Sequence, residues 1–195
     1  MEEVKDTKTS ILAQVARRMD AFEKQEREAK YLQIETKVFE FANFMEAQVS
    51  FMHTSGNTDI PMENIIRKAL AIEKIIVLPV FTDAKNVFHL CKISDYDKDL
   101  VLNARDVLEP DPEKCKKVSL DEVDIAFIPG LAFDDKGGRI GFGNNYYTKF
   151  ITKLPETCRK VALAFEEQIV DQIQMDSRKH TVDIIITDKR MIYKI

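Results

Sequence analysis

Four apolar runs constrain the fold of this chain more than any other feature. They are rich in β-branched residues and have few polar interruptions: "KIIVLPVF" (74–81), "VDIAFIPGLAF" (123–133), "KVALAF" (160–165) and "VDIIITD" (182–188). Strands buried on both faces of a sheet have this composition. The segments between them have helical spacing: "MENIIRKALA" (62–71), "YYTKFITKL" (146–154) and "EEQIVDQI" (166–173). Alternating strands and helices predict an α/β layered fold with a largely parallel central sheet flanked by helices.

Shorter segments complete this layout. "AQVSFM" (47–52) and the alternating "VFHLCKI" (87–93) are predicted strands, and the proline-bearing "EPDPEKCKK" (109–117) is a predicted surface loop. Asp59 is a candidate amino-terminal cap for the helix that follows Pro61.

The first third of the chain is predicted to be helical. One stripe of apolar residues recurs at helical spacing (Ile11, Val15, Met19 and Phe22), and a second stripe follows it (Ile34, Val38, Phe41 and Met45). No glycine or proline interrupts residues 1–55. We expect these helices to pack on the same core, so that residues 1–195 form a single domain.

Composition excludes several classes of protein. The formal net charge is −4, whereas a nucleic-acid-binding protein carries a basic face or arm. No apolar run approaches the ~20 residues of a membrane span. The first residues, "MEEVKDTKTS", are polar and do not resemble a secretory signal. We therefore expect a cytoplasmic protein without a nucleic-acid or membrane partner, as a monomer or a weak homodimer.

The cysteines predict neither a disulfide framework nor a zinc site. Cys91, Cys115 and Cys158 are odd in number, widely spaced and without a C-x-x-C pair. We expect three reduced thiols, as is usual for a cytosolic protein. His53, His89 and His180 are scattered without metal-ligand spacing, which indicates structural or surface positions.

Glycines are concentrated in one loop. The chain has 6 glycines, at positions 56, 130, 137, 138, 141 and 143, so that five of them lie between Gly130 and Gly143. A strand leads into this loop and a helix follows it near Asn144, an arrangement that directs backbone N–H groups at an anion. Arg139 adds a planar set of donors suited to phosphate.

The loop matches neither common phosphate-binding motif. No lysine follows the glycines as a P-loop requires, and Tyr146 stands where a dinucleotide fingerprint has its last glycine. Two readings stay open from local physics: a tight turn with Arg139 on the surface, or an anion-binding loop.

A longer set of segments is similar to a known family. "IPGLAFDDKGGRIGFGNNYYTKF" (128–150) resembles the signature of the 5-formyltetrahydrofolate cyclo-ligase family, P-G-hydrophobic-A-F-D followed by G-x-R-L-G-x-G-x-G-Y-Y-D. Four further segments resemble family segments in the same order: "DIPMENII" (59–66), "KIIVLPVF", "LEPDP" (108–112) and "LAFEEQIV" (163–170), with "VDIIITD" matching the ending. The resemblance covers most of the chain.

The resemblance implies an ATP- and Mg²⁺-dependent ring closure of a reduced folate. 5-Formyltetrahydrofolate becomes 5,10-methenyltetrahydrofolate, and ADP and phosphate are released. The formyl oxygen is phosphorylated, and N10 then closes onto the activated carbon. Such chemistry needs phosphate clamps, a metal and an apolar slot for the pterin.

The resemblance also implies residue roles. The expected nucleotide-binding residues are Lys8, Arg139, Gly141, Phe142, Gly143, Asn144 and Asn145. The expected substrate-binding residues are Phe51, Asp59, Phe133 and Tyr146. Arg139, Tyr146 and Tyr147 are the expected catalytic residues, and Asp134 and Asp183 are the candidate Mg²⁺ ligands. Phe51 and Phe133 also fit a plain core role, and two adjacent tyrosines on a helix are not expected to share a face.

Several site positions depart from the family pattern. Thr148 replaces the aspartate after Y-Y, Asn145 replaces the third glycine, and Lys179 replaces an aspartate. Val80 and Leu12 replace arginines. A threonine hydroxyl is a poor substitute for a carboxylate toward a hard cation. An alternative is therefore a non-catalytic or altered-specificity member that binds folate or nucleotide.

Overall fold

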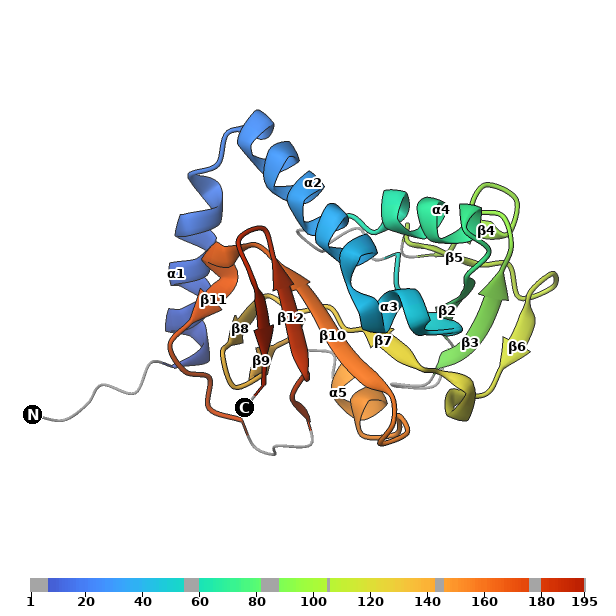
Figure 1. Ribbon diagram of the computed structural model, residues 1–195. Coiled ribbons are helices and arrows are strands. Elements are labelled where there is room, and N and C mark those ends of the chain that lie inside the picture. Colours follow the sequence, from blue (N-terminus) through green and yellow to red (C-terminus); the bar gives the residue numbers. More distant parts are fainter. Residues whose placement is uncertain are drawn as a thin grey trace, which may run out of the picture.

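A computed structural model describes residues 7–54, 60–81, 88–104, 106–142, 146–175 and 180–194. Within these residues an eight-stranded sheet runs through the molecule in the order β13-β12-β10-β7-β1-β2-β3-β6 (Figure 1). The five strands from β12 to β2 are parallel, and β13, β3 and β6 pair antiparallel at the two edges. This confirms the predicted α/β fold with a largely parallel central sheet.

The elements have the following bounds. The helices are α1 (Lys8–Asp20), α2 (Lys24–Glu40), α3 (Ala42–Glu46), α4 (Glu63–Ala71) and α5 (Tyr146–Ile151), with 3₁₀ turns η1 (Leu120–Glu122) and η2 (Glu166–Gln168). The strands of the large sheet are β1 (Val49–Phe51), β2 (Ile75–Phe81), β3 (Phe88–Ile93), β6 (Lys116–Val118), β7 (Ile125–Phe127), β10 (Arg159–Ala164), β12 (Ile184–Thr187) and β13 (Met191–Tyr193). Smaller sheets contain β4 (Leu100–Leu102) with β5 (Leu108–Pro110), and β11 (Ile169–Val170), β8 (Ala132–Asp134) and β9 (Arg139–Ile140).

The order of the strands creates a switch point between β1 and β7. From β1 the chain passes through α4 to β2 on one side, and it later returns to β7 on the other side of β1. In open α/β sheets, ligands bind at the carboxyl ends of the strands where the strand order reverses. The segments that leave β1 and β7 are therefore the expected location of a ligand site.

Apolar side chains cover both faces of the sheet. One core cluster joins the N-terminal helices to the sheet and includes Ile34, Val38 and Phe127, which are at most 1% exposed. The other cluster lies under α5 and includes Phe51 and Phe133. Burial on both faces explains why the parallel strands read as continuous apolar runs.

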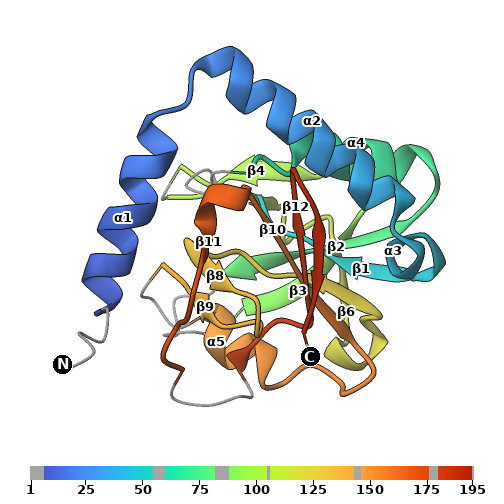
Figure 2. The ribbon, with the colours of Figure 1, turned by 60° about the vertical axis from the view of Figure 1, so that its left-hand side comes forward.

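The N-terminal helices pack on this core, as the apolar stripes predict. Ile11, Val15 and Met19 of α1 are buried. From α2, Lys30 Nζ lies 2.9 Å from Glu167 Oε1 and 3.1 Å from Asp188 Oδ2, at the carboxyl ends of β10 and β12. Figure 2 shows α1 and α2 as two arms of a V beside the sheet. Apolar contact and a partly buried ionic cluster together hold the helices to the sheet.

Four local predictions are wrong in whole or in part. Residues 166–173 form a 3₁₀ turn and a short strand in place of a helix. Within 109–117, residues 111–115 form the predicted loop, whereas the two ends belong to β5 and β6. The run 123–133 divides at Pro129–Gly130 into β7 and β8, which belong to different sheets. Met45 is exposed because the helix breaks at Phe41 and α3 starts in a new phase, so that Phe44 is buried instead.

The prediction of three reduced thiols is wrong for two of the cysteines. Cys91 in β3 and Cys115 just before β6 form a disulfide, with their Cα atoms 5.5 Å apart, and Cys158 is free and buried. The 24-residue separation gave no signal of this pairing, because only the sheet brings β3 and β6 together. Among the described residues, no helix is long and apolar enough to cross a membrane.

Candidate functional site

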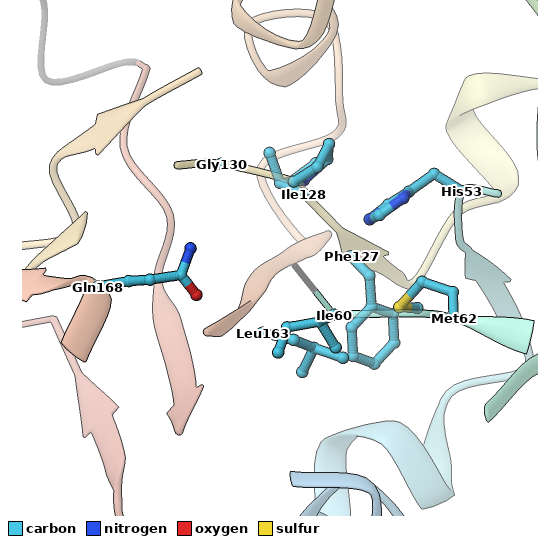
Figure 3. Close-up of a pocket in the computed structure, with 9 residues that line it drawn as sticks. His53, Ile60, Met62, Phe127, Ile128, Gly130, Leu163 and Gln168 are labelled. Atoms are coloured by element: carbon cyan, nitrogen blue, oxygen red, sulfur yellow. The ribbon is translucent and has the colours of Figure 1, made fainter. Parts of the chain in front are cut away.

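A pocket lies at the carboxyl ends of β1, β7 and β10. Its empty space is about 300 Å³, part of which is open to solvent. Its lining comes from the ends of β7 and β10, from the segments after the three strands and from the approach to α4: His53, Ile60, Met62, Phe127, Ile128, Pro129, Gly130, Leu163 and Gln168. Figure 3 shows His53 and Gln168 reaching toward the pocket from opposite sides, above an apolar floor. A concave apolar site with a few convergent polar groups is the usual form of a small-molecule site.

His53 supplies an imidazole to this pocket. It lies two residues after β1 and is 5% exposed. Burial lowers the pKa of the imidazole to about 4, so the ring is neutral at pH 7. Its ring centroid is 6.1 Å from that of Tyr147 in an edge-on arrangement. The pocket therefore presents a neutral donor–acceptor group in apolar surroundings.

Gln168 is held mainly by the protein itself. Its side-chain Oε1 accepts a hydrogen bond from Phe165 N at 2.8 Å, and its Nε2 donates to Leu131 O at 3.2 Å. Neither Gln168 nor His53 was expected as a site residue. Their position directly after buried strands was the available signal, since such segments meet at one edge of a parallel sheet.

Arg139 is a buried cation without a carboxylate partner among the described residues. The residue is 7% exposed. Nη1 donates to Pro129 O at 2.8 Å and Nη2 donates to Thr148 Oγ1 at 3.1 Å, while the buried Nε has no hydrogen-bond partner in the described part of the chain. Both acceptors are neutral. Buried charges in proteins are normally paired, so an unpaired guanidinium is an expected place for an anionic ligand.

The electrostatics of Arg139 are consistent with a retained charge. Burial lowers the pKa of the guanidinium to about 10, which still leaves it protonated at neutral pH. The neighbouring Tyr147 phenol is neutral, because burial raises its pKa. A Cβ atom at Gly141 would lie 2.5 Å from Arg139 Nη1, so only glycine leaves room for the guanidinium here. The surface position that a plain turn implied for Arg139 is wrong.

Arg139 lies directly behind the pocket wall. Pro129 and Gly130 line the pocket, and Pro129 O is the acceptor for Arg139 Nη1. A Cβ at Gly130 would be 2.9 Å from Arg139 Cγ. The loop after β7 thus joins the pocket on one side to the buried cation on the other.

Asp134 is the second buried charge of this region, and the backbone satisfies it. Its Oδ1 accepts hydrogen bonds from Lys136 N at 3.0 Å and Gly138 N at 2.7 Å, and its Oδ2 accepts one from Ile173 N at 2.7 Å. A Cβ at Gly138 would lie 2.5 Å from Oδ2. The carboxylate therefore organises the β8–β9 turn, and this geometry favours a structural role over the metal-ligand role expected from the sequence.

Asp183, the other candidate metal ligand, precedes β12 at the amino end of the sheet. Its Oδ2 accepts a hydrogen bond from Lys160 N at 2.9 Å and lies 3.3 Å from Lys160 Nζ. Across the residues that the structure describes, no group of three or more histidine, cysteine or acidic side chains is arranged to hold a metal ion. Metal binding by Asp134 and Asp183 stays a prediction that the geometry does not favour.

The predicted aromatic residues lie behind the site. Phe51 and Phe133 are 0% exposed and belong to the core under α5. Tyr146 and Tyr147 are both buried in the same cluster and neither lines the pocket, although two adjacent tyrosines on a helix were not expected to share a face. The reason is that α5 has aromatic neighbours on two sides, with Phe81 near Tyr146, and Phe51 near Tyr147.

The remaining predicted residues are distributed as follows. Lys8 is exposed at the start of α1, and Gly141 and Phe142 are half-buried beside Arg139. Asp59, Gly143, Asn144 and Asn145 lie outside the described residues, as does Lys179.

Comparisons with known proteins agree in sequence and in fold. A sequence profile described as the 5-formyltetrahydrofolate cyclo-ligase family matches residues 4–188. A probable 5-formyltetrahydrofolate cyclo-ligase from Caenorhabditis elegans is 26% identical over 202 residues, covering 98% of both chains. A 5-formyltetrahydrofolate cyclo-ligase from Mus musculus is 24% identical over 191 residues, covering 94% of both chains.

A solved structure shares the fold. The NMR structure of Aquifex aeolicus 5,10-methenyltetrahydrofolate synthetase superimposes with a TM-score of 0.80 at 21% sequence identity. The match covers 95% of this chain and 91% of that one.

Proposed function

Because the chain belongs to the 5-formyltetrahydrofolate cyclo-ligase family, we propose that its reaction takes place where the loop of Pro129 and Gly130 brings the pocket next to Arg139. The activity is the ATP-dependent cyclisation of 5-formyltetrahydrofolate to 5,10-methenyltetrahydrofolate, with release of ADP and phosphate. In this reaction ATP phosphorylates the formyl oxygen, N10 bonds to the formyl carbon and loses its proton, and phosphate leaves with that oxygen. The site must therefore hold a flat heterocycle beside a phosphate.

The observation that carries the site assignment is the buried, carboxylate-free guanidinium of Arg139. Its two neutral partners fix the guanidinium plane, and its Nε is left without a protein acceptor among the described residues. Fixed donors in a poorly solvated site stabilise phosphoryl oxygens more strongly than the same donors in water. Arg139 is therefore assigned to the phosphate that is transferred and then released.

The pocket is assigned to the folate. Ile60, Met62, Phe127 and Leu163 give it apolar surfaces on which a flat ring can lie. The space of about 300 Å³ between its lining atoms includes open solvent, and the cavity itself is only about 10 Å³, so the lining must move apart to admit the ring system while the rest of the folate extends into solvent. Phe51, Phe133 and Tyr146 do not line the pocket and are assigned a supporting role in the core beside it. The Tyr147 ring contacts His53, and its phenol lies near enough to Arg139 to interact with it electrostatically.

The nucleotide residues implied by the family stay part of this proposal. They are Lys8, Arg139, Gly141 and Phe142, together with Gly143, Asn144 and Asn145 outside the described residues. The assignment of Gly141 is supported by its position: its backbone lies against the Arg139 guanidinium, where a larger residue would place a side chain.

The described carboxylates do not fit a resident Mg²⁺ ion. Asp134 is occupied by three backbone amides and Asp183 by Lys160. Mg²⁺ is usually held through one or two carboxylates together with substrate phosphates. Neither carboxylate is therefore assigned a role in holding the metal.

The alternative is a member that binds folate or nucleotide without turnover. It is favoured by Thr148, which gives Arg139 a hydroxyl where the family signature has an aspartate. Titration calorimetry with 5-formyltetrahydrofolate and with ATP separates the two: binding without product formation supports the alternative. The cytoplasmic location and the monomeric or weakly dimeric state stay predictions.

The decisive experiment follows methenyltetrahydrofolate absorbance with purified protein, 5-formyltetrahydrofolate, ATP and Mg²⁺. Arg139→Lys keeps a positive charge but cannot donate in the same fork, so kcat/KM should fall about 100-fold. Arg159→Gln, at an exposed position on β10, is the control and should leave kcat/KM unchanged. Absence of an ATP-dependent absorbance rise in the unmodified protein would contradict the proposed function.

A further inference from the structure

The register between β1 and β7 places His53 at the carboxyl edge of the sheet. Phe51 pairs with Ala126, so His53 and Ile128, each two residues further along, leave the sheet side by side. Both of them line the pocket. Phe51 and Met52, which precede His53, are 0% exposed. The backbone that carries the imidazole is therefore anchored in the core.

The imidazole of His53 stands among apolar groups. Figure 3 shows it above a floor that includes Ile60, Met62 and Phe127. Because burial lowers the pKa of the imidazole to about 4, the ring offers one N–H donor and one nitrogen acceptor at pH 7 without a charge. A polar group loses hydration in such a place, whereas an apolar side chain of similar size would not. Packing alone does not account for an imidazole at this position.

Gln168, on the opposite side of the pocket, contributes to the structure of the pocket wall. Its Oε1 accepts from Phe165 N, and its Nε2 donates to Leu131 O, so the amide joins η2 to the segment after β7. The two polar side chains of the lining are thus placed differently: Gln168 bridges two backbone segments, and His53 extends over the apolar floor.

His53 also lies on the side of the pocket that faces the proposed phosphate site. Its ring is edge-on to that of Tyr147, with the centroids 6.1 Å apart, and the Tyr147 phenol interacts electrostatically with Arg139. Ile128, its neighbour in the lining, precedes Pro129, whose carbonyl accepts from Arg139 Nη1. The imidazole is therefore placed where a ring held beside the transferred phosphate would meet it.

We propose that His53 is a specificity-determining residue of this pocket, whose ring nitrogens hydrogen-bond to the bicyclic ring of the reduced folate. The inference rests on the proposed function, because the pocket is assigned there to the folate. The edge of this ring carries N–H groups and a carbonyl, which a group able to donate and to accept can match. Apolar surfaces hold a flat ring without distinguishing its polar edges, whereas a hydrogen bond in a poorly hydrated site does distinguish them.

The test compares two substitutions of His53 with one control. His53→Leu removes both ring nitrogens and keeps an apolar side chain, whereas His53→Asn keeps a donor and an acceptor. His89→Gln is the matched control, because His89 is exposed on β3 and does not line the pocket. His53→Met replaces the leucine variant if thermal melting shows that the latter does not fold.

Titration calorimetry gives the Kd for three ligands: 5-formyltetrahydrofolate, ATP, and 5-formyltetrahydropterin, which keeps the ring and lacks the aminobenzoyl-glutamate tail. His53→Leu should raise the Kd of both ring-bearing ligands about five- to tenfold, the size expected for one hydrogen bond. The Kd for ATP should stay unchanged. His53→Asn should bind the two ring-bearing ligands more tightly than His53→Leu does, and His89→Gln should match the unmodified protein.

Three results would overturn the inference. Unchanged folate affinity in folded His53→Leu would show that the ring does not need this contact. An equal loss of affinity for ATP would show that the substitution disturbs the whole site. A loss for the folate that is absent for the pterin would place the contact on the tail of the substrate.

Binding is measured without turnover, so this test is separate from that of the proposed function. A protein that binds the folate but forms no methenyltetrahydrofolate contradicts the proposed activity, and the comparison of His53 variants still decides the inference. Absence of folate binding to the unmodified protein would contradict both.

Discussion

Asp134 and Arg139 are buried charges on opposite strands of one hairpin, and their surroundings differ in kind. Asp134, on β8, is 2% exposed and receives three backbone N–H groups. Arg139, on β9, is 7% exposed, contacts two neutral acceptors and keeps a buried Nε without a partner in the described chain. A satisfied buried charge is compatible with a purely structural role, whereas an incompletely satisfied one costs stability and is a candidate for binding a ligand.

The same contrast explains the glycine cluster. Gly138 leaves room for the Asp134 carboxylate, and Gly141 leaves room for the Arg139 guanidinium. The two readings of the loop, a turn and an anion site, therefore describe neighbouring parts of it. The turn half is organised around Asp134, and the half proposed to bind phosphate is organised around Arg139.

The largest expected effect is on the structural side. Asp134→Asn should lower the free energy of unfolding by about 3–5 kcal/mol, because a neutral amide replaces the shared acceptor of three buried N–H groups. Urea denaturation measures it. Asp135→Asn is the control. Asp135 is exposed and forms a surface ion pair with Arg190 at 3.5 Å, and such pairs contribute little, so the change in stability should stay within about 0.5 kcal/mol. A similarly small loss for Asp134→Asn would remove the structural half of the comparison.

His53 differs from both, because it is a buried titratable group that is uncharged in the folded protein. Its pKa falls from 6.5 to about 4 on folding. Between these values the unfolded chain binds the proton and the folded chain does not, so stability rises with pH across this window. As pH falls from 6.5 to 4, this group should remove about 3 kcal/mol of stability.

Denaturation at several pH values measures this term. His53→Leu should flatten the dependence between pH 4 and 6.5, while His89→Gln, at an exposed position on β3, should leave it in place. If His53→Leu retains the full slope, His53 is not the buried neutral group described for the pocket.

The paired glycines give a smaller and more selective effect. Gly138→Ala should cost about 1–3 kcal/mol, because the added Cβ meets a carboxylate that three amides hold in place. Gly141→Ala meets the far end of a long side chain, so its stability cost should be below about 1 kcal/mol. Gly141→Ala should instead raise the KM for ATP by displacing Arg139. Equal stability losses in both variants would contradict the division of the loop into two parts.

The smallest stability change is expected for Arg139→Met. Replacing an incompletely satisfied buried charge with an apolar side chain of similar length should change the free energy of unfolding by no more than about 1 kcal/mol, in either direction. Turnover should nevertheless be lost. Thermal and urea unfolding measure the first effect, and methenyltetrahydrofolate absorbance measures the second. Unfolding of this variant at low urea would show that Arg139 is structural.

The sequence by itself determined the fold class, because the apolar runs at 74–81, 160–165 and 182–188 are typical of strands buried on both faces of a sheet and alternate with segments of helical spacing. It also placed Arg139 among the candidate site residues, since an arginine within clustered glycines is unusual in a glycine-poor chain. The collinear motifs identified the family, which matches residues 4–188.

Only the tertiary structure decided how these residues are used. His53 and Leu163 are 110 positions apart in the sequence and line one pocket because β1, β7 and β10 are neighbours. Asp134 Oδ2 accepts a hydrogen bond from Ile173 N, which comes from a distant segment, and this contact favours a structural role over metal binding. The charge of Arg139 has no counter-charge among the described residues, because Pro129 O and Thr148 Oγ1 accept its hydrogen bonds. Sequence patterns report which side chains are buried, whereas hydrogen-bond satisfaction depends on partners that only the folded chain brings together.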